Sequence, residues 1–321
     1  MKKLLLMLLM PLTMVTAQAQ SNDYNMVIKL NNGTKITLDA NDVKDLTFNG
    51  DALSISGNTI ADLYSQIARL EVLFNRVQDK VSRERTFKVN GESFKMVKVV
   101  GGAFQMGATS EQGSDAYDDE SPVHRVTLSN YYIGETEVTQ ALWYAVMGQR
   151  PTSDGNQWNS TYGVGYDYPV YNVSWDDCQE FISKLNELTG EQFRLPTEAE
   201  WEFAARGGNH SLGYKYAGSN TIDDVAWYNS NSDSKTHPVG TKAPNELGLY
   251  DMSGNVWEWC QDWYGSYSSS DQTDPVGPSS GTGRVGCGGS WYNYASYCRV
   301  AARYNYTPSN RYYRVGLRLA L

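Results

Sequence analysis

Residues 248–264, with the sequence GLYDMSGNVWEWCQDWY, constrain the fold of this chain more than any other stretch. Asp251 and Glu258 are carboxylates in a strongly aromatic segment, and a carboxylate that is buried needs a partner. The segment also contains three large side chains that favour burial, each with one N–H group to pair: Trp257, Trp259 and Trp263. The stretch therefore predicts a buried turn in which acidic oxygens must be neutralised.

A hard cation would satisfy this demand, because Ca²⁺ binds carboxylate and backbone carbonyl oxygens from a turning segment. The candidate ligands are the side chains of Asp251 and Glu258 and the carbonyls of Gly254 and Val256. The alternative is a core turn whose carboxylates pair with Arg or cap backbone N–H groups. No EF-hand pattern is present, so the spacing alone does not choose between the two.

Further motifs accompany this stretch in a fixed order. They are GGAFQMG at 101–107, ETEVT at 135–139, PV at 169–170, VSWDD at 173–177, RLPTEAEWE at 194–202, GGSW at 288–291 and GLR at 316–318. Together they resemble the formylglycine-generating enzyme (sulfatase-modifying factor) superfamily over about residues 96–321. The resemblance implies a loop-rich α+β fold related to the C-type lectin fold. It also implies a structural Ca²⁺ at Asp251, Gly254, Val256 and Glu258.

The first 19 residues have the three parts of a secretory signal peptide. Lys2 and Lys3 form the charged start, residues 4–9 the apolar run, and Ala17-Gln18-Ala19 the cleavage site. The run is shorter than the roughly 20 apolar residues that span a membrane, and no later stretch reaches that length. We therefore expect an exported periplasmic or extracellular protein that begins near Gln20. Its net charge of −9 argues against a nucleic-acid partner.

Two smaller segments precede the main domain. Residues 20–57 alternate in polarity around Asn-Gly turns, which predicts a small β-hairpin module. Residues 58–86 predict an amphipathic helix followed by a linker, and the main domain is expected over 87–321. Apolar residues recur at steps of three and four between 60 and 81, which is typical of a short coiled coil. This seam would form a homo-oligomer, or else pack the helix on its own domain.

The chain has four cysteines: Cys178, Cys260, Cys287 and Cys298. In an oxidising compartment an even number of cysteines favours disulfides, and four cysteines allow three pairings. We expect one disulfide that involves Cys260 or Cys298, and the sequence leaves its partner open.

The resemblance makes a specific statement about catalysis. Formylglycine-generating enzymes bind Cu(I) through two cysteines, separated by four residues, shortly after the Gly-Gly-Ser-aromatic motif. Counted without gaps from this motif, Asn293 stands at the first of these positions and Cys298 at the second, whereas alignment backwards from residues 299–303 matches neither cysteine. Cu(I) selects soft thiolate ligands, which an asparagine cannot replace. Copper is therefore not expected, unless Cys287 supplies the missing thiolate.

Iron-dependent relatives in the superfamily use a histidine cluster. His124, His210 and His237 are far apart in the sequence, so an iron site is not expected either.

Residues 291–314 are rich in Tyr, Asn, Ser and Arg, a composition typical of adaptable binding surfaces. The candidate binding residues are Tyr292, Asn293, Tyr294, Tyr304, Tyr306, Tyr312 and Arg314. The alternative is that these aromatic side chains pack a loop-rich core.

Two functions remain from the sequence. The first is an exported binding module for a protein or glycan ligand, without catalysis. The second is an oxidoreductase of the formylglycine-generating type that acts on a cysteine of exported proteins such as sulfatases, with Cys298 as its catalytic residue.

Overall fold

The computed structural model describes residues 84–151 and 158–321, and the backbone of six strands between residues 4 and 57. The chain divides into two compact units, Met1–Lys80 and Val81–Leu321. In the first unit β3 pairs antiparallel with β4, and β6 pairs antiparallel with β1 and β5. The strands are β1 (Leu4–Met7), β2 (Val15–Thr16), β3 (Asn25–Lys29), β4 (Lys35–Asp39), β5 (Val43–Asn49) and β6 (Ala52–Gly57). The helix predicted over 60–81 lies outside the described residues, and the signal peptide and hairpin module remain predictions.

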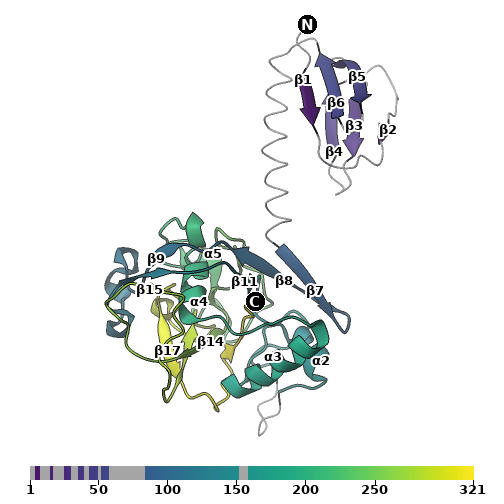
Figure 1. Ribbon diagram of the computed structural model, residues 1–321. Coiled ribbons are helices and arrows are strands. Elements are labelled where there is room, and N and C mark those ends of the chain that lie inside the picture. Colours follow the sequence, from purple (N-terminus) through teal and green to yellow (C-terminus); the bar gives the residue numbers. More distant parts are fainter. Residues whose placement is uncertain are drawn as a thin grey trace. The chain divides into compact units, whose positions relative to one another are not determined.

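The second unit has a mixed α/β fold with small sheets and long loops (Figure 1). Its α-helices are α2 (Gln140–Met147), α3 (Trp175–Thr189), α4 (Glu198–Ala205) and α5 (Ile222–Val225). Its 3₁₀ turns are η2 (Ser110–Asp115), η3 (Asp118–Glu120), η4 (Gly208–His210) and η5 (Ala295–Tyr297). No helix in the described part of the chain is both long and apolar enough to cross a bilayer.

Four sheets carry the second unit. One has the order β11-β8-β7, formed by Tyr131–Gly134, Glu92–Val99 and Glu84–Val89. Another has the order β15-β10-β9, formed by Gln272–Thr273, His124–Thr127 and Ala103–Met106. A short parallel pair joins β12 (Ala226–Trp227) to β13 (Ser253–Gly254). The fourth has the order β17-β16-β14-β18, formed by Arg303–Tyr306, Arg284–Cys287, Trp257–Trp263 and Val315–Gly316.

Helix caps agree closely with the sequence. Ser174 caps α3 and forms a reciprocal capping box with Asp177, and Thr197 does the same for α4 with Glu200. Gly148 ends α2 in the left-handed conformation. The helical period from 136 to 147 predicts Thr136 as the N-cap of this helix, but the N-cap is Thr139, since the N–H of Val138 donates to the carbonyl of Leu317.

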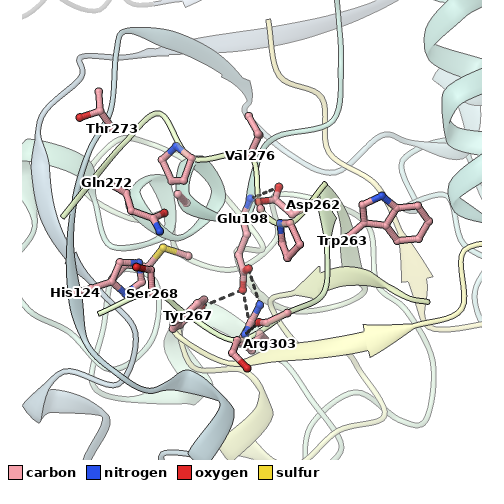
Figure 2. Close-up of a pocket in the computed structure, with 17 residues that line it drawn as sticks. His124, Glu198, Asp262, Trp263, Tyr267, Ser268, Gln272, Thr273, Val276 and Arg303 are labelled. Carbon is pink, nitrogen blue, oxygen red and sulfur yellow. Dashed lines mark hydrogen bonds and ion pairs between the residues drawn. The ribbon is translucent and has the colours of Figure 1, made fainter. Parts of the chain in front are cut away.

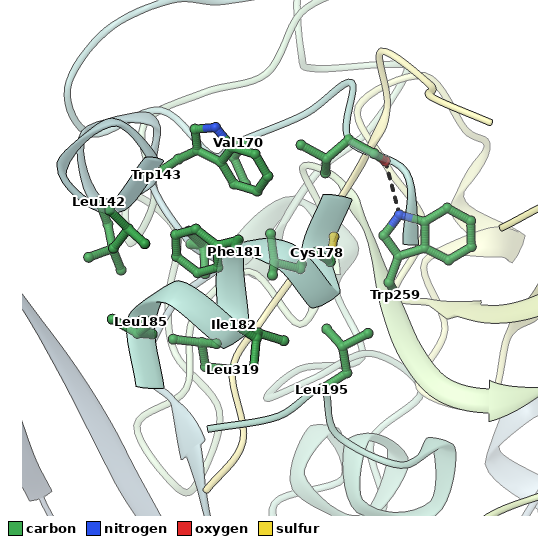
Figure 3. Close-up of a cluster of buried hydrophobic side chains, with 14 of the residues drawn as sticks. Leu142, Trp143, Val170, Cys178, Phe181, Ile182, Leu185, Leu195, Trp259 and Leu319 are labelled. Carbon is green, nitrogen blue, oxygen red and sulfur yellow. Dashed lines mark hydrogen bonds between the residues drawn. The ribbon is translucent and has the colours of Figure 1, made fainter. Parts of the chain in front are cut away.

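A large apolar core fills the space between α2, α3 and the strands around β14. Cys178, Phe181, Ile182 and Leu185 form the buried face of α3. Trp143 of α2 stacks on Phe181 with ring centroids 5.0 Å apart (Figure 3). Trp259 is fully buried, and its indole N–H donates to the carbonyl of Val173 at 3.1 Å. The aromatic stretch at 248–264 therefore enters the core, as its composition predicts.

Two segments differ from expectation. The linker predicted to end at Thr86 is shorter, because β7 begins at Glu84 and pairs with β8. The polar and acidic composition of residues 110–120 predicts an exposed loop, but the segment folds into η2 and η3 and buries Glu120 completely. Glu120 pairs with Arg299, also fully buried, and this ion pair was not visible in the sequence.

Candidate functional site

An aromatic cluster lies where β14 and β17 meet the loops after β16. Trp257 begins β14, and its ring centroid lies 5.8 Å from that of Tyr304 and 6.1 Å from that of Tyr306 on β17. Tyr306 in turn contacts Tyr312, with centroids 4.8 Å apart. Tyrosines predicted as binding residues from the stretch 291–314 thus pack around Trp257, which belongs to the stretch 248–264.

Gly286 makes this packing possible. Strand β16 lies between β14 and β17, and Gly286 pairs with Tyr304. A Cβ atom at residue 286 would lie 2.9 Å from the ring of Tyr306, closer than real contacts allow. The missing side chain lets the tyrosine rings reach across β16 to Trp257.

The outer layer of the cluster is exposed. Tyr292, Tyr294 and Tyr304 are 54%, 71% and 42% exposed, whereas Tyr306 is only 3% exposed. Tyr306 therefore lies beneath the surface and supports Tyr304, in contrast to its predicted place on the binding surface. We call the exposed and half-buried residues Tyr292, Tyr294, Tyr304, Tyr312 and Arg314 the aromatic face.

Arg314 connects the two ends of this face. Its guanidinium lies 5.5 Å from the ring centroid of Tyr292 and 5.6 Å from that of Tyr313, within the range of cation–π attraction. Its Nε also donates to the Tyr306 hydroxyl at 3.5 Å. These contacts hold the Arg314 guanidinium beside the aromatic rings, so its position in the face is set before any ligand binds.

Asn293 is fixed at the edge of the cluster. Its side-chain oxygen accepts from the indole N–H of Trp257 at 2.9 Å and from the Ser290 hydroxyl at 2.5 Å. Its backbone N–H donates to the Ser290 carbonyl, and its own carbonyl accepts from Asn229. The carboxamide therefore has a structural role at the position where the resemblance places the first copper cysteine.

Cys298 follows η5 and is completely buried. Burial raises the pKa of its thiol to about 12. Its Sγ lies 3.9 Å from the carbonyl oxygen of Tyr294. Burial therefore favours the protonated thiol in the metal-free protein, and a metal that bound this sulfur would have to displace its proton.

The other cysteines are also buried thiols. Cys260 on β14 and Cys287 on β16 have sulfur atoms 3.7 Å apart. Of the pairings left open by the sequence, this one brings two sulfurs into contact across neighbouring strands.

The predicted calcium residues are fully or almost fully buried, but they do not have equivalent surroundings. Both oxygens of Glu258 pair with the guanidinium of Arg318, at 2.7 and 2.9 Å, and one also accepts from the Trp201 indole at 2.6 Å. Asp251 accepts from the N–H of Gly240 at 2.6 Å. Within residues 84–151 and 158–321, no group of three or more His, Cys, Asp or Glu side chains could hold a metal ion. In this structure the charge of Glu258 is matched by Arg318, and the calcium site remains a prediction.

Two cavities lie away from the aromatic face. One, of about 520 Å³, contains the buried pair Glu198–Arg303 between α4 and β17 (Figure 2). Asp262 on its wall accepts from the Glu198 N–H at 2.9 Å, and burial followed by repulsion from Glu198 raises its pKa to about 7. The other cavity, of about 510 Å³, is lined by Glu137 and Gly240. Neither is lined by a residue of the aromatic face.

Sequence reasoning missed two parts of the site. Trp257 is in the core, as predicted, but the hydrogen bond by which its indole N–H holds Asn293 was not predicted. Tyr117, from the segment expected as a loop, stacks near Tyr297 at 5.2 Å and shares a hydrogen bond with Ser296. The GNVWEW motif contained a signal for Trp257, whereas nothing in the sequence connects residue 117 with residues 296–297.

Comparison with known proteins identifies related chains. Residues 82–321 match the family model of the sulfatase-modifying factor enzyme 1-like domain. The formylglycine-generating enzyme of Streptomyces coelicolor is 34% identical, with 70% of this chain and 88% of that protein covered. The chaperone protein LppX of Paenibacillus barcinonensis is 33% identical, with 64% and 81% covered. The structure of Treponema denticola variable protein 1 is 38% identical with a TM-score of 0.65, covering 74% of this chain and 98% of that one.

Proposed function

The chain belongs to the sulfatase-modifying factor enzyme 1-like family, and we propose that it is an exported, non-catalytic binding module. Its ligand, a protein or a glycan, contacts the aromatic face. The observation that carries this proposal is Asn293, whose carboxamide occupies the first copper position and is held by Trp257 and Ser290. Export rests on the signal-peptide pattern of residues 1–19.

The chemistry of the two copper positions argues against oxygen activation. A linear Cu(I) site needs two soft anionic sulfurs. Asn293 offers a neutral oxygen that already accepts two hydrogen bonds, and the buried Cys298 favours its protonated form. Forming a site here would require loss of both hydrogen bonds and deprotonation of a buried thiol.

The aromatic face has the properties of a recognition surface. Tyr292, Tyr294 and Tyr304 expose large rings that lose little conformational entropy on binding. Arg314 adds directional donors, and aromatic residues with Arg are enriched among residues that dominate binding energy. The relatives include a protein named as a chaperone and a bacterial variable protein, so this fold is also found in proteins whose names do not denote the enzyme.

Copper titration tests the absence of catalysis. Fully reduced protein is titrated with Cu(I) in competition with a chromophoric chelator. We expect the wild type to bind no copper tightly, and the variant Asn293→Cys to serve as a positive control by restoring two thiols. One equivalent of tightly bound copper in the wild type, lost in Cys298→Ser, would overturn the proposal.

Array binding tests the aromatic face. Labelled protein is applied to glycan and peptide arrays, and the best ligand is measured with variants by calorimetry. Tyr304→Ala should weaken binding by about 1–2 kcal/mol, because it removes an exposed aromatic contact. Tyr144→Ala is the matched control, since Tyr144 is 56% exposed on α2 outside the face. Equal losses in the two variants would place the ligand elsewhere.

The alternative is an oxidoreductase that converts a cysteine of exported proteins such as sulfatases, with Cys298 as the essential residue. It is favoured by the 34% identity to a formylglycine-generating enzyme. Oxygen consumption in the presence of a cysteine-containing sulfatase peptide, abolished by Cys298→Ser, would establish it.

A further inference from the structure

The loop of residues 265–278 closes one side of the cavity of about 520 Å³. The remaining walls come from α4, β9, β10, β14 and β17 (Figure 2). The loop is tied to the fold by β15, which pairs parallel with β10, and by Asp274, which accepts from the N–H and the hydroxyl of Ser129 at 2.7 Å. Small-molecule sites are typically clefts of about 300–1,000 Å³, so this cavity is large enough for a ligand of that kind.

Asp262 has unused hydrogen-bonding capacity on the wall of this cavity. Its side chain is only 4% exposed, and its Oδ2 accepts from the N–H of Glu198 at 2.9 Å. No donor among the described residues is hydrogen-bonded to its Oδ1. Buried carboxylates normally have hydrogen-bond partners, because removal of a charge from water is costly. The second oxygen is therefore available to a donor that enters the cavity.

Arg303 is the basic residue on the cavity wall, but its donors are already used inside the protein. Its Nε and Nη2 donate to the two oxygens of Glu198 at 2.6 and 2.8 Å. Its Nη1 donates to the carbonyls of Asp119 and Gly265, at 3.1 and 2.8 Å. An anion in the cavity would therefore find no free donor on Arg303.

The charges around Asp262 favour a cation in the cavity. Burial, followed by repulsion from Glu198, raises the pKa of Asp262 to about 7. The charged groups that act on it are Glu198 and Glu200 from α4, Arg303 from β17, Arg284 from β16, and Arg194. The arginines do not return the pKa to its usual value, so ionisation remains costly. A cation that entered the cavity would stabilise the ionised form of this carboxyl.

The rest of the wall suits the apolar body of a small organic molecule. Apolar side chains in the same cavity are Met106, Pro275, Val276 and Pro278. A bare metal ion fits poorly, because residues 84–151 and 158–321 contain no group of three or more His, Cys, Asp or Glu side chains that could hold one. An ammonium group needs only a few acceptors, such as the Asp262 carboxylate and the side-chain oxygens of Ser268 and Gln272 on the wall.

We propose that the cavity binds a small organic amine, whose ammonium group pairs with Asp262 and whose apolar body packs against Val276 and the neighbouring prolines. A lysine side chain of a partner protein has the same ammonium chemistry. The free amine is favoured, because Asp262 is almost completely buried beneath the loop. The site is separate from the aromatic face and does not rest on the proposed function.

Benzylamine is the probe, because it joins one ammonium group to one compact apolar ring. Its binding to the full chain at pH 8 is measured by calorimetry and by ligand-detected NMR. We expect one site per chain, with the neutral analogue benzyl alcohol bound at least about tenfold more weakly, since hydrogen bonds between charged groups are the stronger ones. Nα-acetyl-lysine amide represents a partner's lysine side chain. It should bind more weakly than benzylamine, because its flexible chain loses more conformational entropy.

Asp262→Asn retains an acceptor for the Glu198 N–H but removes the charge, so benzylamine should lose its advantage over benzyl alcohol. Asp271→Asn is the matched control, because it removes a carboxylate that is 75% exposed in the same loop but outside the cavity wall. It should retain the wild-type preference. Gln272→Lys leaves Asp262 in place and adds an ammonium group to the wall, which should weaken benzylamine and spare benzyl alcohol. Circular dichroism verifies the fold of each variant.

The pH dependence of binding provides a second test. Because Asp262 must ionise to pair with the amine, the affinity of the wild type should rise by about tenfold between pH 6 and pH 8. The rise should disappear in Asp262→Asn; its persistence would assign it to His124 on the same wall and overturn the inference. Absence of benzylamine binding, or equal affinity for benzyl alcohol, would also overturn it. Tighter binding of the lysine probe would assign the site to a partner protein and refute the free amine.

Discussion

Replacing Asn293 by alanine removes an acceptor on which two buried donors depend. The Trp257 indole N–H would lose its 2.9 Å bond inside a fully buried environment. An unsatisfied buried donor costs about 1–3 kcal/mol, and the Ser290 hydroxyl loses a further bond worth about 0.5–1.5 kcal/mol. We therefore expect Asn293→Ala to lower the free energy of unfolding by about 1.5–4.5 kcal/mol. For a domain of this size, that corresponds to a fall in Tm of roughly 3–18 °C.

Urea unfolding of the two proteins, followed by tryptophan fluorescence and circular dichroism, measures this difference directly. Asn229→Ala is the control, because Asn229 is exposed and its backbone N–H, which donates to Asn293, is retained. The control should stay within about 0.5 kcal/mol of the wild type. If Asn293→Ala were equally mild, the carboxamide would not hold Trp257 and Ser290, and the structural role assigned to it would be wrong.

Three further predictions concern groups around this site. Treatment with oxidised glutathione under partly unfolding conditions should form a disulfide between Cys260 and Cys287, because their sulfur atoms are 3.7 Å apart. Cys178 and Cys298 should remain thiols. Peptide mapping that finds another pairing would contradict this prediction. Burial raises the pKa of Asp262 from 3.8 to about 7, so its protonated form stabilises the fold. This contribution is full below about pH 4 and is lost as the pH rises through 7. Asp262→Asn should therefore flatten the fall in the urea midpoint between pH 5 and 8, and an unchanged slope would show that other groups cause the fall. Arg299→Met should lower the free energy of unfolding by about 3–5 kcal/mol, because it leaves the fully buried Glu120 unpaired. Adding Glu120→Gln to this variant should recover most of that loss. Thermal unfolding of the single and double variants measures the coupling between the two residues, and additive losses would refute it.

Local signals in the sequence were sufficient for several elements. The caps at Ser174 and Thr197 can be read from the sequence, because a cap depends on residues three apart. The buried face of α3 follows from helical periodicity. The order of motifs between Met96 and Leu321 identified the family, which the match over residues 82–321 confirms.

The sequence also named every residue of the aromatic face, since all five lie in one stretch of unusual composition. It did not separate exposed from buried members. Tyr306 is two residues from Tyr304 on the same strand face, yet it packs under its neighbour because Gly286 leaves space across β16. The composition of a stretch indicates a binding surface, whereas the burial of each tyrosine ring depends on the side chains of the neighbouring strand.

Charge pairing was decided by the tertiary structure alone. Glu120 lies in a segment that reads as an exposed acidic loop, and its partner Arg299 is almost 180 residues away. Arg318 directs its hydrogen bonds to Glu258, which is 60 residues away in the sequence, and not to the nearby carboxylates of Glu137 and Asp251. Local sequence determines where helices begin and which residues are apolar, because those properties depend on near neighbours. Which charges meet inside the protein depends on long-range packing, because ion pairs in a dry interior are strong only at short distances.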